Sequence, residues 1–124
     1  MGKILLTLTA TLAFWSVNAA DVTPITEAFR TGKAEALKGK MSAEIDIVVP
    51  DGSKKVAGEQ AVAILDNFFK SHKVSGFTVV HNADKNESGF IVGKLSTDKG
   101  EFRVNITYTA SKDGKILIQI IRIE

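Results

Sequence analysis

The sequence predicts an α+β domain in which helices pack on one face of a strongly bent, mostly antiparallel sheet. Apolar residues recur at helical spacing in three segments of the first half of the chain, and from Gly76 onward nearly everything is strand and turn. Each predicted helix carries one apolar stripe, so all of them must share one face of the sheet. The expected order of elements is ααββαββββ.

Residues 1–20 have the pattern of a secretory signal peptide. Lys3 supplies the positive charge, Ile4 to Trp15 form the apolar region, and Val17-Asn18-Ala19 is a small-residue cleavage pattern. The apolar run is shorter than the roughly 20 residues that span a bilayer. We therefore expect a mature chain that begins at Ala20 or Asp21.

Composition narrows the class of protein. The chain has 124 residues, a formal net charge of +2 and no cysteine, so it has no disulfide and no site for lipoprotein attachment. Charges of both signs are interspersed, which disfavours nucleic-acid binding. We expect a single domain over residues 21–124, located in the periplasm or secreted, with no membrane association once the leader is removed.

Two short helices are predicted at the start of the mature chain. Thr23 is the expected N-cap of the first, Pro24 occupies the favoured first position, and Gly32 ends the helix. A second short helix is predicted over Lys33 to Lys40.

From Ser42 the apolar period changes to two, which indicates a strand that stops at Pro50-Asp51-Gly52. The strand's apolar residues are Ala43, Ile45, Ile47 and Val49. The Asp-Gly pair before Ser53 to Val56 predicts a hairpin.

The third helix has the clearest apolar stripe in the chain. Its members are Ala61, Ile64, Leu65, Phe68, Phe69 and His72. This spacing predicts that Ala61, Ile64, Leu65 and Phe68 pack on the sheet. His72 falls in the last turn, where we expect it to cap backbone carbonyls.

Four strands are predicted to follow as an antiparallel meander, over Phe77–Asn82, Gly89–Ser96, Glu101–Ser111 and Lys115–Ile123. The last strand is apolar on both sides by simple alternation. One face would carry Ile116, Ile118 and Ile120, and the other Leu117, Ile121 and Ile123. A strand of this kind must be covered twice. The second cover is either another copy of the chain, which makes a homodimer, or the bent sheet's own edge or the segment 33–41.

This order of elements resembles the nuclear-transport-factor-2-like fold, also called cystatin-like, which is a cone-shaped α+β domain. The segments that carry a narrower resemblance are Ile25–Phe29, Val48–Gly52, Asn67–Phe69, Phe77–His81 and Leu117–Glu124. They are similar to the exported Bacteroidetes family called domain of unknown function 4783. The resemblance implies a fold and an exported location, and it implies no activity.

Four residues are candidates for ligand binding: His81, Tyr108, Gln119 and Arg122. Tyr108 shares a strand face with Val104 and Ile106, so its phenol either reaches a cavity or fills the core at its rim with the hydroxyl in solvent. His81 shares a face with Phe77 and Val79, which would aim it into the cone. Polar side chains within apolar strands, such as Gln119 and Arg122, need a partner if they are buried.

The sequence offers no convincing catalytic acid–base pair, no histidine spacing typical of a metal site and no cofactor motif. We therefore expect non-catalytic binding of a small apolar or amphipathic ligand, or of a protein partner. One alternative is a cavity-based isomerase or hydrolase that uses Tyr108 and His81, which would need a carboxylate within hydrogen-bond reach of either. Another is a cystatin-like inhibitor or adaptor that acts through loops such as Pro50 to Lys55.

Overall fold

The computed structural model describes residues 21–85, 87–111, 113 and 115–124, so the predicted leader lies outside the described residues. The elements are α2 (Thr23–Thr31), the 3-10 turn η2 (Ala34–Leu37), β1 (Met41–Val49), β2 (Gly52–Ala57), α3 (Gly58–Ser71), β3 (Val74–Lys85), β4 (Ser88–Thr97), β5 (Gly100–Ala110) and β6 (Ile116–Ile123). The predicted order is confirmed, except that the second helix is a single 3-10 turn.

The six strands form one mixed sheet in the order β2-β1-β6-β5-β4-β3. The meander from β3 to β6 and the β1–β2 hairpin are antiparallel, as predicted. The two units join where β1 pairs in parallel with β6, which the sequence did not indicate. This pairing places the hairpin beside the last strand. The long connection that a parallel pair requires is formed by β2, α3 and the first three strands of the meander.

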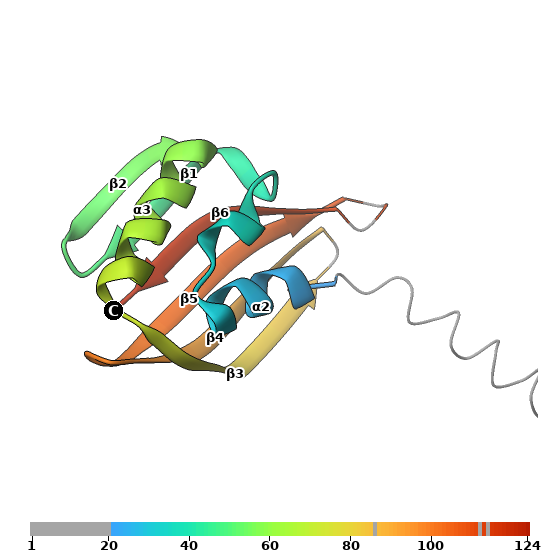
Figure 1. Ribbon diagram of the computed structural model, residues 1–124. Coiled ribbons are helices and arrows are strands. Elements are labelled where there is room, and N and C mark those ends of the chain that lie inside the picture. Colours follow the sequence, from blue (N-terminus) through green and yellow to red (C-terminus); the bar gives the residue numbers. More distant parts are fainter. Residues whose placement is uncertain (1–20, 86, 112, 114) are drawn as a thin grey trace, which may run out of the picture.

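The helices lie on one face of the sheet (Figure 1). α2 packs against β3, whereas α3 packs against β1, β2 and η2. Phe29 of α2 connects the two helices to the sheet, because its ring centroid lies 5.6 Å from that of Phe69 on α3 and 5.4 Å from that of Phe77 on β3. The core between the layers is apolar, and its largest fully buried side chains include Ile25, Phe29, Leu37, Leu65, Ile91, Leu95, Ile106 and Tyr108.

The start of α2 differs from the prediction. Thr23 lies within the helix, and the carboxylate of Asp21 accepts a hydrogen bond from the Thr23 backbone N–H at 3.0 Å. Hydrogen bonding to Thr23 lowers the pKa of the Asp21 carboxyl. At the other end Gly32 adopts φ 68°, the left-handed conformation that ends the helix as predicted.

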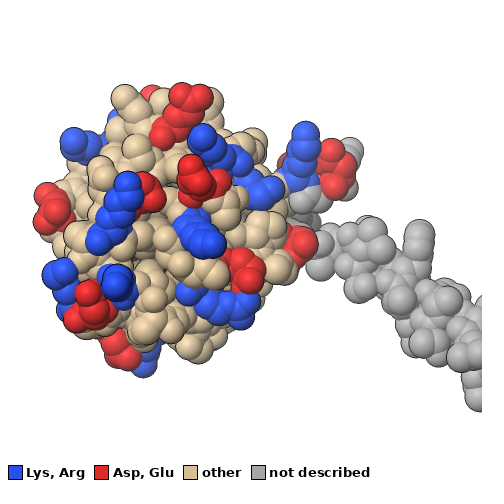
Figure 2. All heavy atoms as spheres, viewed as in Figure 1, with Lys and Arg blue, Asp and Glu red and all other residues tan. Residues whose placement is uncertain are grey.

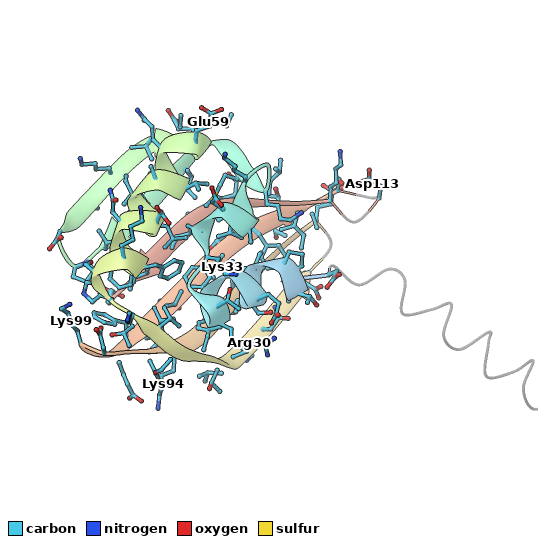
Figure 3. All side chains as sticks on the ribbon, in the orientation of Figure 1. Arg30, Lys33, Glu59, Lys94, Lys99 and Asp113 are labelled. Carbon is cyan, nitrogen blue, oxygen red and sulfur yellow. The ribbon has the colours of Figure 1, made fainter. Side chains whose placement is uncertain are left out.

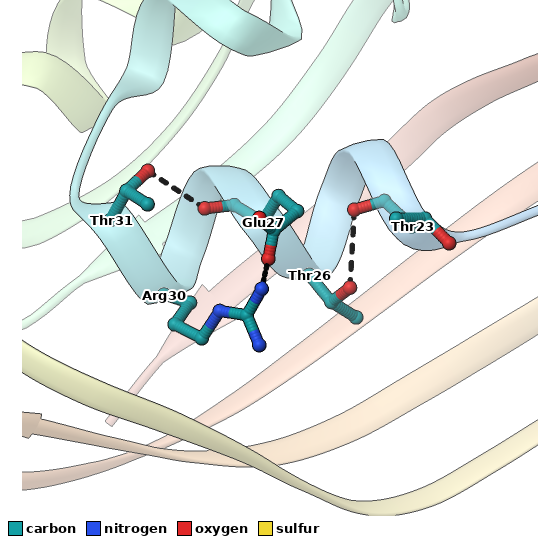
Figure 4. A network of polar contacts seen from close by, with 5 residues as sticks. All are labelled: Thr23, Thr26, Glu27, Arg30 and Thr31. Atoms are coloured by element: carbon teal, nitrogen blue, oxygen red, sulfur yellow. Dashed lines mark hydrogen bonds and ion pairs between the residues drawn. The ribbon is translucent and has the colours of Figure 1, made fainter.

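The exposed side of α2 satisfies its own polar groups (Figure 4). The hydroxyl of Thr26 donates to the Thr23 carbonyl at 3.1 Å, that of Thr31 donates to the Glu27 carbonyl at 2.8 Å, and Arg30 pairs with Glu27. All of these contacts lie within one helix, so they are contacts of a solvated helix surface.

α3 buries a slightly rotated version of the predicted stripe. Its buried residues are Ala61, Val62, Leu65, Phe68 and Phe69, whereas Ile64 is only half-buried. Phe69 belongs to the predicted stripe and packs on Phe29 of α2, so the difference is that Val62 is buried where Ile64 was expected. His72 caps the helix as predicted, since its Nδ1 lies 3.0 Å from the carbonyl oxygen of Phe68.

Candidate interaction surface

A β-bulge at Gln119 decides which side chains of β6 point outward. Tyr108 of β5 pairs with Ile118, and the preceding residue Thr107 pairs with Ile120, so Gln119 is an extra residue on β6. An extra residue reverses the alternation of faces beyond it. Ile118, Ile121 and Ile123 are therefore all buried on the helix side. The simple alternation predicted for this strand, which placed Ile121 and Ile123 opposite Ile118, is wrong.

Two apolar side chains of β6 are left on the opposite face. Leu117 is 41% exposed and Ile120 is half-buried. In the strand register Ile120 is followed across the sheet by Thr107 of β5 and then by Phe90 of β4, which is 40% exposed. We call the apolar residues of this face the outer patch, and they are Val48, Phe90, Val92, Leu117 and Ile120.

Among the described residues, no helix packs on the outer patch, because α2, η2 and α3 all lie on the other side (Figure 1). Two ion pairs lie at opposite ends of this face. Lys55 Nζ is 4.0 Å from Asp46 Oδ1, and Lys94 Nζ is 3.8 Å from Glu101 Oε1. Between these pairs Arg122 is exposed in the row of Val92, and Arg103 is exposed beside Lys94.

Three of the four residues predicted to bind a ligand lie on this outer face. Arg122, Asn105, Val92 and His81 are successive partners across β6, β5, β4 and β3, so Arg122 and His81 belong to one cross-strand row. Both are exposed. The His81 ring lies 5.4 Å from the ring of Phe90 on the outer face. The prediction that His81 points into the cone is therefore wrong.

Gln119, the bulge residue, is half-buried, and its Nε2 donates to the Thr109 hydroxyl at 3.4 Å. A half-buried amide needs a hydrogen-bond partner, and for Gln119 this partner is Thr109 on the neighbouring strand of the same sheet. Phe90 and Ile120 were not predicted to be surface residues. For Phe90 a signal was present, because alternation with the buried residue Ile91 places Phe90 outward.

Tyr108 lies on the other side of the sheet and is fully buried. Its hydroxyl is 3.5 Å from Asn82 Nδ2, which donates to it. Burial raises the pKa of the Tyr108 phenol, the bond from Asn82 opposes this, and the charge of Asp84 adds to it. The hydroxyl is thus buried in the core, and the sheet separates it from His81.

The helix-bearing face gives no comparable candidate. Figure 2 shows basic and acidic side chains interspersed over it, with no cluster of one sign. Within the described part of the chain, no group of three or more His, Cys, Asp or Glu side chains is arranged to hold a metal ion. Across the same residues, no helix has the length and hydrophobicity needed to cross a membrane.

Known proteins resemble this chain along nearly its whole described length. A family model described as "Domain of unknown function (DUF4783)" matches residues 22–124. The crystal structure of a DUF4783 family protein from Bacteroides ovatus is 35% identical, with a TM-score of 0.75, and the match covers 82% of this chain and 91% of that one. A counterpart from Bacteroides uniformis is 31% identical, with a TM-score of 0.78 and coverage of 84% and 96%. No curated protein matches.

A more distant likeness concerns the fold alone. An NTF2-like protein of unknown function from Cytophaga hutchinsonii is 13% identical, with a TM-score of 0.58, and the match covers 83% of this chain and 84% of that one. The nuclear-transport-factor-2-like fold expected from the order of elements is thereby confirmed.

Proposed function

The chain belongs to the DUF4783 family, and we propose that it is a non-catalytic binding domain whose outer patch binds protein, in the first place a second copy of the same chain. The observation that carries the proposal is the uncovered apolar centre of the sheet's outer face, where Phe90 and Leu117 are 40% and 41% exposed. Apolar side chains grouped on one face of a sheet are typical of an interaction site.

The outer face has the size that such an interface needs. Strands lie about 4.8 Å apart and rise about 3.3 Å per residue, so a six-stranded face of this length presents roughly 700 to 1,000 Å². A stable interface buries about 800 Å² on each partner. The sheet face alone is therefore large enough for one complete interface.

The distribution of charge on this face suits a second copy. In a two-fold interface the same surface meets itself, so a patch dominated by one sign of charge would repel its copy. Here the apolar centre is flanked by the Asp46–Lys55 and Lys94–Glu101 pairs, each of which contains both signs. Arg122 at the edge of the patch and Arg103 beside Lys94 are both exposed on this face, and in a dimer each can pair with a carboxylate of the facing copy.

The geometry gives less support to the alternatives. A cavity-based isomerase or hydrolase would use Tyr108 and His81 together, but the sheet separates them, and Asn82 is the hydrogen-bond partner of the Tyr108 hydroxyl. An adaptor that acts through the loop Pro50 to Lys55 would need apolar side chains at the loop tip, and that loop is exposed and carries Asp51 and Lys54.

Analytical ultracentrifugation of the purified protein at about 10 to 100 μM tests the proposal. The wild-type protein should have twice the mass of the chain, and Ile120→Glu should be a folded monomer, because the new carboxylate would lie buried between two sheets. Ala63→Glu on the exposed side of α3 is the matched control and should remain dimeric. Ile121→Glu does not test the interface, because Ile121 lies in the core.

A wild-type protein that sediments as a stable, soluble monomer over this whole range would contradict the homodimer. So would an Ile120→Glu variant that keeps the wild-type mass while circular dichroism shows it to be folded.

A further inference from the structure

A groove on the helix side of the molecule lies between the β1–β2 hairpin and α3, and it is separate from the outer patch. Its volume is about 390 Å³, within the range of small-molecule sites. Ile47, Val49 and Lys54 line it from the hairpin, and Ile64, Phe68 and His72 line it from α3. The turn of the hairpin and the C-terminal end of α3 lie at the same end of the molecule (Figure 1).

The imidazole of His72 is held rigidly at one end of this groove. It stacks on Phe68, with ring centroids 4.2 Å apart and planes 13° apart, and Phe102 contacts it edge-on at 5.3 Å. Its Nδ1 lies 3.0 Å from the Phe68 carbonyl oxygen and 2.9 Å from the Ser71 hydroxyl. A carbonyl can only accept, so a hydrogen bond between Nδ1 and Phe68 requires the tautomer with the hydrogen on Nδ1, and in that tautomer Nε2 is an acceptor.

Two hydrogen-bond acceptors face a ligand in the groove, beside Lys54 and Asn67, whose side chains can themselves donate. Among the described residues, none forms a hydrogen bond with Nε2 of His72, and the exposed carboxylate of Asp51 is a second acceptor that lines the groove. The C-terminal end of α3 adds partial negative charge. Lys99, which Figure 3 shows beside that end of the molecule, donates to the Ser71 carbonyl, which is one of the carbonyls at the end of α3.

We propose that this groove binds a small planar aromatic molecule that carries one N–H or O–H donor, such as an indole or a phenol. The ring lies against the half-buried side chains of Val49 and Ile64, and the donor points to Nε2 of His72. The stacked Phe68 and His72 rings give the site an aromatic wall, which favours edge-to-face or offset contact with a second ring. This site is independent of the proposed interface on the outer patch.

Isothermal titration calorimetry at pH 8 with indole and with 1-methylindole tests the proposal, because the two probes differ in the N–H donor. Wild-type protein should bind indole about three- to tenfold more tightly than 1-methylindole, the range that one hydrogen bond supplies. His72→Phe keeps a ring on Phe68 but removes Nε2, so it should bind both probes equally. Ile120→Glu, on the other face, should bind indole as the wild type does.

Amide chemical shifts in two-dimensional NMR locate the site independently. Indole should shift the amides of Val49, Gly52 and Ser71 around the groove. Three outcomes would overturn the proposal: no saturable indole binding, the same preference for indole in His72→Phe as in the wild type, or shifts confined to the outer patch.

Discussion

The ring of Phe77 on β3 lies directly over Gly93 on β4. A Cβ placed on Gly93 would be 2.5 Å from Cε1 of that ring and 3.0 Å from the carbonyl oxygen of Thr78. Phe77 also contacts Phe29 of α2, with ring centroids 5.4 Å apart. The absence of a side chain at position 93 therefore lets α2 approach the sheet through one shared aromatic contact.

Gly93→Ala should lower the free energy of unfolding by about 1 to 3 kcal/mol, because the added methyl must displace a ring that is packed on both sides. Chemical denaturation measures the loss. Gly76→Ala is the matched control in β3, since a Cβ there meets nothing within 4 Å, and it should leave stability unchanged or slightly raised. Equal stabilities of the two variants would contradict the close contact.

Phe68→Ala should cost about 3 to 5 kcal/mol of unfolding free energy, the loss typical of a buried phenylalanine. The Phe68 side chain is 6% exposed and contacts the rings of Phe69, His72 and Phe102. Asn67→Ala, at the neighbouring exposed position, is the control and should change stability little. A loss below about 1 kcal/mol for Phe68→Ala would show that α3 does not hold the core.

Alkaline pH should destabilise the wild-type protein more than Tyr108→Phe. Burial raises the pKa of Tyr108 above its ordinary value of 10.0, so above that pH the unfolded chain loses a proton that the folded chain keeps. This contribution to the free energy of unfolding is complete at pH values below the ordinary pKa, and it is lost as the pH rises through the raised pKa of the folded protein. Urea unfolding at several pH values between 9 and 11.5 measures the difference.

Since every other titrating group is common to both proteins, the difference between the two pH profiles reports Tyr108 alone. Parallel loss of stability in wild type and Tyr108→Phe would mean that the phenol titrates in the folded protein as it does in water.

Expression in a bacterium with export machinery should yield a protein that begins at Ala20 or Asp21, because Val17-Asn18-Ala19 has the small-residue pattern of a cleavage site. N-terminal sequencing of the periplasmic fraction or the culture medium measures this. Ala19→Arg together with Ala20→Arg should block the cleavage. Mature protein that starts at Met1 would contradict both the leader and the proposed exported location.

Much of the architecture follows from local pattern. The change from helical to two-residue period at Ser42, the Asp-Gly turn and the apolar stripe of α3 each depend on neighbours in sequence. The structure confirms them, except that Val62 is buried in place of Ile64 in the stripe. The surroundings of the candidate residues do not follow from local pattern, because a side chain's environment depends on strands that lie far apart in the chain. His81 and Arg122 share a row only because three neighbouring pairs of strands align in register.

The last strand is an example of an arrangement that local sequence does not determine. The sequence determined that β6 carries apolar residues on both sides, from which a second cover is predicted. Only the tertiary structure decided which residues go where, since the bulge at Gln119 reverses the alternation and returns Ile121 to the core while Ile120 faces outward. A bulge lets two paired strands keep both their hydrogen bonds and their packing. Its position depends on the register between the two strands, which the sequence of one strand does not specify.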